Sequence, residues 1–291
     1  MEWNNRVSSA LSLCSPMIMS RLEGALSRQI ESGQQRLMEL SFPAADRVYI
    51  GSEACEYLFC RNADVLLNSA KTLNESGLAV TLVTPPVSQF EMDSVLTLIS
   101  RFDLNLLADE VVCNDIGVIR CCISSLKHMK IRAGRFFDKV SREARFDPFK
   151  ASEMQKNRRI FRTPWPVQNE LGAYLKRMGI DGFETDCIPG ETLDMDFPGW
   201  SFALCYPGII LSYATTCEFA GSQLPVDQKF IPGRCLCECT DYSVEACARD
   251  TYMKIIKSGR IVEAVCHTDI CDCFKGNCRV VLSTQPGRKS E

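Results

Sequence analysis

Cysteine is the residue type through which this sequence could do chemistry. The chain has 17 cysteines but only 2 histidines. Four of the cysteines form the densest group, Cys217, Cys235, Cys237 and Cys239, with three thiols inside five residues. Thiolates bind soft metals and iron–sulfur clusters, and a four-residue step such as Cys235 to Cys239 can wrap one corner of a cluster. Tetrahedral zinc would use the same ligands, but the C-x2-C spacing common in zinc sites is absent, so the spacing favours iron–sulfur.

A second cysteine group lies near the C-terminus. Cys266, Cys271, Cys273 and Cys278 have the spacing C-x4-C-x-C-x4-C, and His267 follows the first of them. This spacing could hold a further metal. The alternative is a cysteine-rich terminal segment whose thiols only pack against one another.

Composition limits the protein class and its compartment. A chain of 291 residues that is 46% hydrophobic can bury a sizeable core without disulfides. We expect a cytoplasmic protein with free or metal-bound thiols, because 17 cysteines cannot pair completely and no stretch approaches the ~20 apolar residues of a membrane span. The net charge of −3 provides no overall basic field to attract nucleic acid or anionic lipid.

Strand and helix patterns alternate along the chain and must position these thiols. Short β-branched runs are each followed by a turn signal and by helical apolar spacing, which is typical of a parallel α/β sheet. We expect a TIM-barrel-like α/β barrel, complete or incomplete, with a doubly wound sheet as the alternative. The predicted strands are 47–51, 79–83, 111–113, 130–134, 182–187 and 202–213, and the clearest helices are 62–76, 91–102 and 168–178.

The pattern also predicts three regions. Residues 1–40 form an N-terminal extension, 41–232 the barrel-like domain and 233–291 a cysteine-rich C-terminal segment. Within the barrel-like domain, residues 139–162 carry eight Lys or Arg against three Asp or Glu. This excess favours an exposed linker over an RNA-facing patch, because charge runs are usually solvated and few aromatic residues interleave with it.

Barrel chemistry is expected where strands end and the following loops begin. Two such ends carry residues of interest, the loop from Gly51 to Cys55 and the turn Gly134-Arg135. No H-E-x-x-H or G-x-S-x-G motif provides hydrolase machinery, and no G-x-G-x-x-G or P-loop motif provides a nucleotide cradle. The sequence therefore assigns no catalytic residue.

Several motifs resemble the collagenase-like peptidase family (unassigned peptidase family thirty-two), and within it most closely the UbiV branch of oxygen-independent hydroxylation proteins. The signature region is residues 208–217 (GIILSYATTC) followed by the step from Cys235 to Cys239. Upstream, residues 48–55 (VYIGSEAC) are similar to that branch's first strand and loop cysteine. The stretches 108–118 and 130–139 resemble its N-D-x-G-V and A-G-R-x-x-N-K motifs, so the resemblance covers roughly 45–240.

The resemblance implies a [4Fe-4S] cluster at the open end of the barrel. Its ligands would be Cys55, Cys217, Cys235 and Cys239, with Cys237 as the main competitor. Members of this branch work as heterodimers with a paralogous partner in oxygen-independent hydroxylation of the ubiquinone ring, with prephenate as the oxygen source. Other relatives hydroxylate RNA nucleobases.

Two features of the motifs bear on mechanism. Peptidase-type members read E-x-F-x-H-G where this chain has Ala203, Cys205 and Pro207, so the polar groups of a peptidase are missing. Arg135 either binds a dicarboxylate such as prephenate or forms a local salt bridge. The main expectation is an iron–sulfur hydroxylase or its accessory subunit, and the alternatives are a zinc-stabilised RNA-modifying protein and a peptidase.

Overall fold

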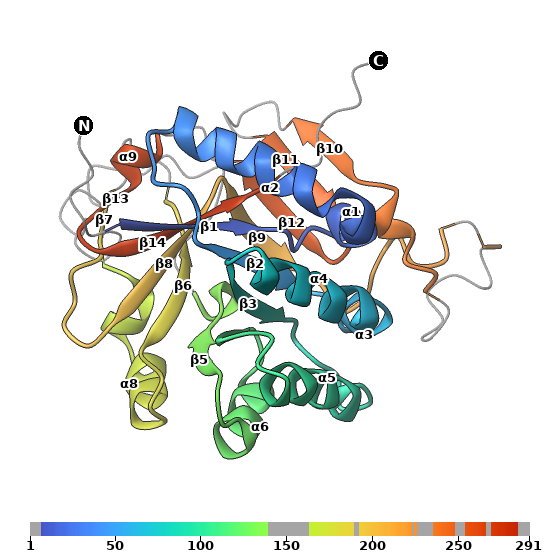
Figure 1. The fold of residues 1–291 in the computed structure, drawn as a ribbon, viewed down its shortest axis with the longest axis horizontal. Coiled ribbons are helices and arrows are strands. Elements are labelled where there is room, and N and C mark those ends of the chain that lie inside the picture. Colours follow the sequence, from blue (N-terminus) through green and yellow to red (C-terminus); the bar gives the residue numbers. More distant parts are fainter. Residues whose placement is uncertain are drawn as a thin grey trace.

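Eight parallel strands close into a barrel in the computed structural model, which describes residues 7–138, 163–188, 192–222, 224–225, 235–247, 254–265 and 269–284. The strand order is β1-β14-β8-β6-β5-β4-β3-β2, and β1 pairs in parallel with both β14 and β2 (Figure 1). The predicted TIM-barrel-like architecture is therefore confirmed. The barrel strands are β1 (Val7–Ser12), β2 (Arg47–Gly51), β3 (Ala79–Thr84), β4 (Glu110–Cys113), β5 (Lys130–Ala133), β6 (Gly182–Asp186), β8 (Ser201–Tyr206) and β14 (Cys278–Ser283).

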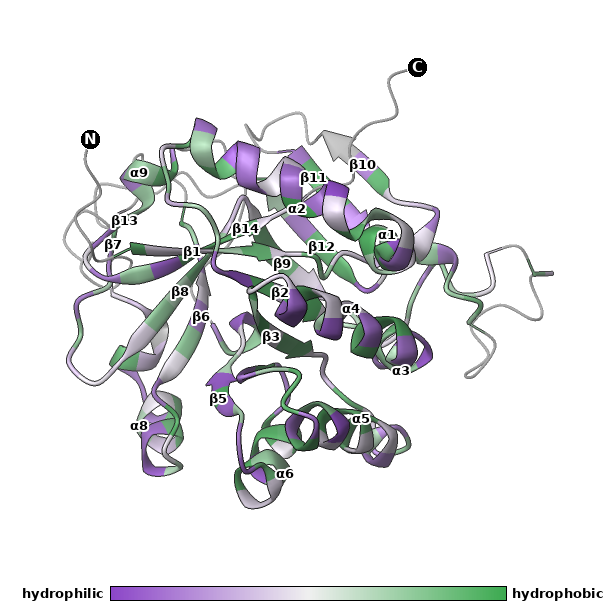
Figure 2. Cartoon of the chain, in the orientation of Figure 1, coloured by the Kyte–Doolittle hydropathy of each residue, from purple (hydrophilic) through white to green (hydrophobic). Residues whose placement is uncertain are grey.

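Helices follow most of these strands and cover the outside of the barrel. In α4 (Ala63–Glu75) the residues Leu66, Leu67, Ala70 and Leu73 recur at helical spacing and are all buried. Figure 2 shows mixed hydrophilic and hydrophobic residues along α2, whereas β3 is mostly hydrophobic. The other α-helices described are α1 (Pro16–Met19), α2 (Leu22–Glu39), α3 (Glu56–Arg61), α5 (Met92–Leu104), α6 (Ile116–Ser125), α8 (Glu170–Arg177) and α9 (Ile270–Cys273).

The predicted strand 202–213 is two strands in different sheets. Its first half is β8 of the barrel, and its second half is β9 (Gly208–Tyr213), which pairs antiparallel with β12 (Ile261–Val265). A second sheet has the order β10-β11-β12-β9, with β10 (Val244–Cys247) and β11 (Lys254–Ser258). Pro207 stands between the two strands and has no N–H for a ladder hydrogen bond, so both ladders stop there. A short pair, β7 (Leu193–Asp194) and β13 (Phe274–Lys275), lies apart from both sheets.

The barrel extends beyond the predicted domain limits of 41 and 232. Strand β1 comes from the segment expected to be an N-terminal extension, and β14 comes from the cysteine-rich C-terminal segment. Their six-residue parallel pairing closes the barrel. The segments 1–40 and 233–291 are therefore not simple appendages, because the barrel would have two open edges without them.

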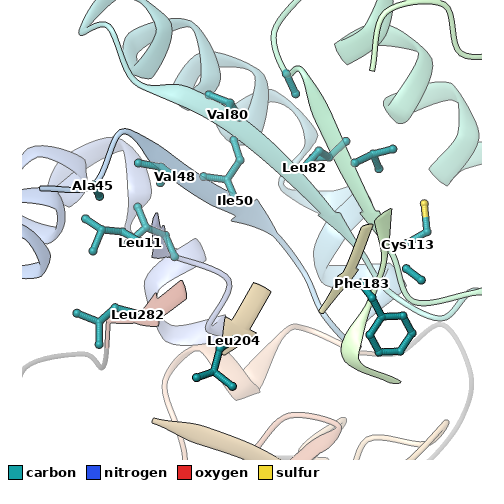
Figure 3. Packing of buried hydrophobic residues seen from close by; sticks show 14 of the residues in the cluster. Leu11, Ala45, Val48, Ile50, Val80, Leu82, Cys113, Phe183, Leu204 and Leu282 are labelled. Atoms are coloured by element: carbon teal, nitrogen blue, oxygen red, sulfur yellow. The ribbon is translucent and has the colours of Figure 1, made fainter. Parts of the chain in front are cut away.

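Alternate residues of the strands point to two different cores. Val48, Ile50 and Leu82 belong to the large cluster that also contains the apolar faces of the helices (Figure 3). Tyr49, Val83 and Cys205 belong to a smaller cluster inside the barrel. This period of two is the strand geometry that separates helix-facing from barrel-facing side chains. No helix within the described ranges is long and apolar enough to cross a membrane.

Candidate functional site

Five of the predicted ligand cysteines line one pocket at the carboxyl end of the barrel. Cys55 follows β2, Cys217 follows β9, and the other three belong to the 235–239 loop. The space between the lining residues is about 410 Å³, including the part that opens to solvent. The structure thus gathers thiols from three distant parts of the sequence. The cysteines of this pocket, called here the cysteine pocket, are Cys14, Cys55, Cys217, Cys235, Cys237 and Cys239.

A fixed turn after β2 positions Cys55. Gly51 has φ +127°, and a Cβ atom there would lie 2.1 Å from the carbonyl oxygen of Val83. The backbone N–H of Ser52 donates to that same carbonyl at 3.0 Å. The N–H of Cys55 in turn donates to Ser52 Oγ at 3.1 Å, and Cys55 directly precedes α3. Only glycine adopts this conformation readily, so Gly51 determines the path of the turn that leads to Cys55.

The side chains of Cys217 and Cys239 form a hydrogen-bonded pair. A hydrogen bond from the Cys239 thiol lowers the pKa of Cys217 to about 6, and the backbone N–H groups of Phe219 and Ala220 also lower it. The same hydrogen bond raises the pKa of Cys239, and burial raises it further. Cys217 is therefore the thiolate of the pair near neutral pH, and Cys239 carries the proton.

Cys235 and Cys237 form a second pair. A hydrogen bond from the Cys237 thiol lowers the pKa of Cys235 to about 7, and the Cys237 backbone N–H donates to Cys235 Sγ at 3.3 Å. Cys237 has φ +64°, a left-handed conformation that folds the loop back on itself. Its sulfur also accepts from Arg61 Nη1 at 3.6 Å. Cys237 therefore remains a competitor of Cys239 as a ligand, although its thiol is already engaged by Arg61.

The carboxylate of Glu238 joins the two cysteine segments. Its Oε1 accepts from the backbone N–H of Gly221 at 2.7 Å, which belongs to the turn after Cys217. Its Oε2 accepts from the N–H of Leu236 at 3.2 Å and lies 3.9 Å from Cys235 Sγ. One buried side chain thus fixes the position of the 235–239 loop relative to Cys217.

Among the described residues, the thiols line one pocket without forming a site for a single metal ion. In the part of the chain that the structure describes, no three or more His, Cys, Asp or Glu side chains are close enough to hold a single metal ion. A tetrahedral zinc with bonds of about 2.3 Å would need sulfurs only about 3.8 Å apart. Cys55 is nevertheless within electrostatic range of Cys217 and Cys235, which raise its pKa together with the larger effect of burial. In its chemistry, a set of four thiols around one pocket, the donor set is the one that iron–sulfur clusters use.

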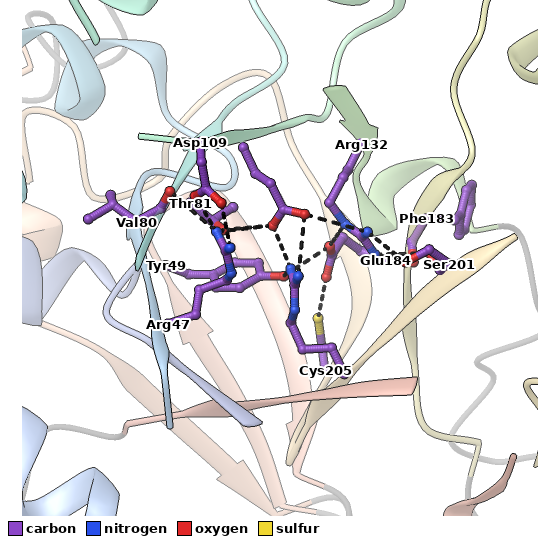
Figure 4. A network of polar contacts seen from close by, with 12 residues as sticks. Arg47, Tyr49, Val80, Thr81, Asp109, Arg132, Phe183, Glu184, Ser201 and Cys205 are labelled. Carbon is purple, nitrogen blue, oxygen red and sulfur yellow. Dashed lines mark hydrogen bonds and ion pairs between the residues drawn. The ribbon is translucent and has the colours of Figure 1, made fainter. Parts of the chain in front are cut away.

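A second, polar pocket lies inside the barrel beside the cysteine pocket. Its lining includes Tyr49, Glu184 and Cys205, and Glu53 lines both pockets. Glu184 accepts from the Tyr49 hydroxyl at 3.3 Å, from Arg132 Nε at 2.9 Å and from the Cys205 thiol at 3.8 Å (Figure 4). Burial raises the pKa of the Glu184 carboxyl, while the charge of Arg132 opposes this effect.

Arg135 is buried and saturated by the chain's own acceptors. Its Nε and Nη2 donate to Glu53 at 3.1 and 2.5 Å, and Nη2 also donates to Glu263 at 2.9 Å. Its Nη1 donates to Asp186 at 2.9 Å and to the carbonyl oxygen of Gly208 at 2.8 Å. These are five hydrogen bonds for the five N–H groups of a guanidinium. Of its two predicted roles, the geometry supports the local salt bridge, since a substrate carboxylate would have to displace Glu53 or Glu263.

The second predicted metal group is only partly described. Cys266 and His267 lie outside the described residues, as does the basic segment 139–162. Cys273 and Cys278 are buried in the large core cluster, and Cys271 packs against it. Burial also raises the pKa of Cys278 and of Cys271. These three residues therefore pack in or against the core, and metal binding by the whole group stays a prediction.

Sequence reasoning missed several residues of the two pockets. Glu53 lies in the strand-end loop that the sequence singled out, but a lone carboxylate there has no distinguishing pattern. Glu238 was missed for the same reason. Arg260 follows Gly259 in a turn between two β-branched runs, which is a hairpin signal, but nothing in the sequence shows that the hairpin tip reaches the thiols.

Comparisons with known proteins do not identify a relative. Models of known protein families give no match to this chain. Neither a curated protein nor a solved structure matches it. A function therefore has to follow from the two pockets and from the motifs quoted above.

Proposed function

We propose that this chain is an iron–sulfur protein whose cysteine pocket binds a [4Fe-4S] cluster. The observation that carries this proposal is the gathering of Cys55, Cys217, Cys235 and Cys239 around one hollow, with no three of the described ligand-type side chains close enough for a single ion. Thiolates are the ligands such clusters use. The resemblance to the UbiV branch named the same four residues independently of the structure.

The two thiol pairs prepare the site to bind a cationic group. Cys217 and Cys235 have lowered pKa values, because each accepts hydrogen bonds from a neighbouring thiol and from backbone N–H donors. Cys239 and Cys55 must lose their protons when they become ligands. The backbone donors at Cys217 and Cys235 would remain as hydrogen bonds to ligand sulfur, which help to set a cluster's potential.

A bound cluster would supply single electrons. The adjoining barrel pocket suggests where a small polar substrate would lie, because Glu53 lines both pockets. Tyr49, Glu184 and Cys205 would face that substrate with hydroxyl, carboxyl and thiol groups. Taken with the resemblance, this arrangement supports an oxygen-independent hydroxylase or its accessory subunit, acting on a ubiquinone-type ring with a paralogous partner.

Metal analysis tests the cluster directly. Protein purified without oxygen should show a broad absorption band near ~400 nm and about four iron and four sulfide per chain. Replacing Cys55, Cys217 or Cys239 singly by alanine should remove the band. Cys60→Ser is the matched control, because Cys60 lies on the helix that follows Cys55 and does not line the pocket. A colourless protein with about one zinc would overturn the proposal and favour the RNA-modifying alternative.

The hydroxylation role needs its own experiment. Cells grown without oxygen that carry Cys217→Ala should lose the hydroxylated ring product, whereas cells with Cys60→Ser should keep it. Unchanged product in the Cys217→Ala strain, with the cluster shown to be absent from the purified variant, would contradict a role in hydroxylation and leave the iron–sulfur assignment standing.

A further inference from the structure

Two buried polar groups without a partner line the cysteine pocket. Among the residues described, the buried side-chain nitrogen and oxygen atoms that lack a hydrogen-bond partner include Arg260 Nε and Ser258 Oγ. Both residues line the pocket, together with Gly259 and Ile261. A buried donor without an acceptor costs free energy and needs an explanation, and a molecule bound in the pocket that both residues line would provide one.

The two groups lie at the tip of the β11–β12 hairpin. Ser258 pairs with Ile261 in the ladder, so Gly259 and Arg260 form the turn between the strands. Gly259 has φ +58°, and a Cβ atom there would lie 3.5 Å from Cys239 Cβ. The hairpin tip therefore lies directly against one of the proposed ligands.

The guanidinium of Arg260 is fixed at its outer end. Its Nη1 lies 3.7 Å from Glu56 Oε1, and its Cζ lies 5.5 Å from the centre of the Tyr57 ring. Glu56 is itself fixed, because it accepts from the backbone N–H of Ser88 at 2.5 Å. The Arg260 side chain is only 9% exposed. These contacts engage one end of the guanidinium and leave the Nε–H without an acceptor.

The charge of Arg260 also acts on the thiols of the pocket. Its positive charge lowers the pKa of Cys55, against the larger opposing effect of burial, and it is among the groups that lower the pKa of Cys217. Arg260 lines the same pocket as these two thiols.

We propose that the hairpin tip is part of the cluster site, with the Arg260 Nε–H and the Ser258 hydroxyl donating hydrogen bonds to the cluster's sulfur atoms. This inference rests on the proposed iron–sulfur function. The acceptor is a sulfide or a ligand thiolate, both of which carry negative charge. Either one would provide the hydrogen-bond acceptor that these two donors lack among the described residues. Because reduction adds one electron to the cluster, donors at its sulfurs stabilise the reduced state more than the oxidised state. The hairpin tip would therefore raise the midpoint potential.

The test is a midpoint potential measured by redox titration of anaerobically purified full-length protein. Ser258→Ala and Arg260→Lys should retain about four iron per chain and titrate at a more negative potential than the unmodified protein. Arg260→Lys keeps the positive charge but loses the Nε–H donor, so a negative shift in this variant reports the hydrogen bond and not the charge. Iron–sulfur stretching bands in resonance Raman spectra should shift in the same two variants.

Two controls come from the same sheet. Ser212 is exposed on β9, opposite Val262, and Lys257 pairs with Glu218 at the surface. Ser212→Ala and Lys257→Gln should leave the potential unchanged, because neither residue lines the pocket.

The outcomes separate the two proposals. Full iron content with unshifted potentials and Raman bands in both hairpin variants would overturn the hairpin inference and leave the cluster intact. Unmodified protein without iron would overturn the cluster proposal and this inference with it. If Arg260→Lys does not bind iron, the Ser258→Ala result decides, because removing a hydroxyl that has no partner should not impair folding.

Discussion

Replacing Arg135 by methionine would remove the cation that three carboxylates share inside the barrel mouth. The guanidinium is 4% exposed, and Asp186, its most buried partner, is 2% exposed. Glu53 and Glu263 are more accessible, at 17% and 28%. The substitution keeps most of the side-chain volume, so its effect reports the loss of charge and hydrogen bonds more than the loss of packing.

The expected cost comes mainly from Asp186. Removing one partner of a buried ion pair costs about 3–5 kcal/mol, because the other charge is left buried without compensation. Asp186 would retain the backbone N–H of Ile210, which donates to it at 3.0 Å. Glu53 and Glu263 can gain water, so each should add about 1 kcal/mol or less. We expect the free energy of unfolding to fall by about 3–5 kcal/mol at pH 7.5.

The cost should shrink as the pH falls. Burial already raises the pKa of the Glu263 carboxyl, and the charge of Arg135 opposes that rise. Without Arg135 the folded-state pKa rises further above the unfolded value, so the folded variant binds more protons than the unfolded chain. Stability of the variant therefore increases as the pH is lowered from 7.5 to 5.5, relative to the unmodified protein.

Urea unfolding followed by circular dichroism at both pH values measures this effect. Arg135→Lys is the matched variant, because it retains the charge with three donors in place of five and should lose less stability. A loss below about 1 kcal/mol at pH 7.5, together with weaker binding of prephenate, would refute the structural role and restore the role in substrate binding.

Three further predictions test the fold and the thiols. Gly51→Ala should lower the free energy of unfolding by about 2 kcal/mol or more, because φ is +127° and the new Cβ would meet the Val83 carbonyl; urea unfolding measures it, and a change below about 0.5 kcal/mol would contradict the turn. Asp103→Ala should cost about 2–3 kcal/mol at neutral pH, because its carboxylate accepts three backbone N–H groups between α6 and β5 at 2.8–2.9 Å. Burial opposes ionisation of the Asp103 carboxyl, but the three N–H groups outweigh burial and lower its pKa. The difference in unfolding free energy between Asp103→Ala and the unmodified protein should therefore close below about pH 4, and a difference that does not depend on pH would contradict this. In metal-free protein, the alkylation rate of Cys217 should level off above about pH 7, whereas that of Cys60, whose pKa burial raises to about 11, should keep increasing with pH. Peptide mass spectrometry measures both rates, and identical pH profiles would contradict the prediction.

The barrel was predictable where strands carry continuous apolar or β-branched runs. Strands β2, β3 and β4 have such runs and were found within a residue or two of their bounds. Strand β1 was missed because Val7-Ser8-Ser9-Ala10-Leu11-Ser12 contains three serines. Its stability comes from pairing with β14, which is more than 250 residues away, and no local pattern can report such a contact.

The gathering of the four cysteines was predictable from the sequence, whereas the residues around them were not. Four thiols named from spacing and motif resemblance share one pocket, because the barrel brings the loop after β2 next to the loops that leave β9. The charged residues that position them are single side chains in unremarkable sequence. Glu238 and Arg260 gain their importance only from contacts made across the fold, at Gly221 and against Glu56.

The barrel and the second sheet both contribute residues to the cysteine pocket. The barrel contributes Cys14 and Cys55, and Cys55 lies on a turn fixed by a glycine and by two hydrogen bonds that the N–H groups of Ser52 and Cys55 donate. The second sheet contributes another part of the lining, since β9 leads into Cys217 and the β11–β12 hairpin tip lies against Cys239. Strand β9 itself begins where the chain leaves the barrel after β8. A group bound by all four thiols would therefore connect the barrel to the second sheet, and its loss should loosen that sheet before it disturbs the barrel.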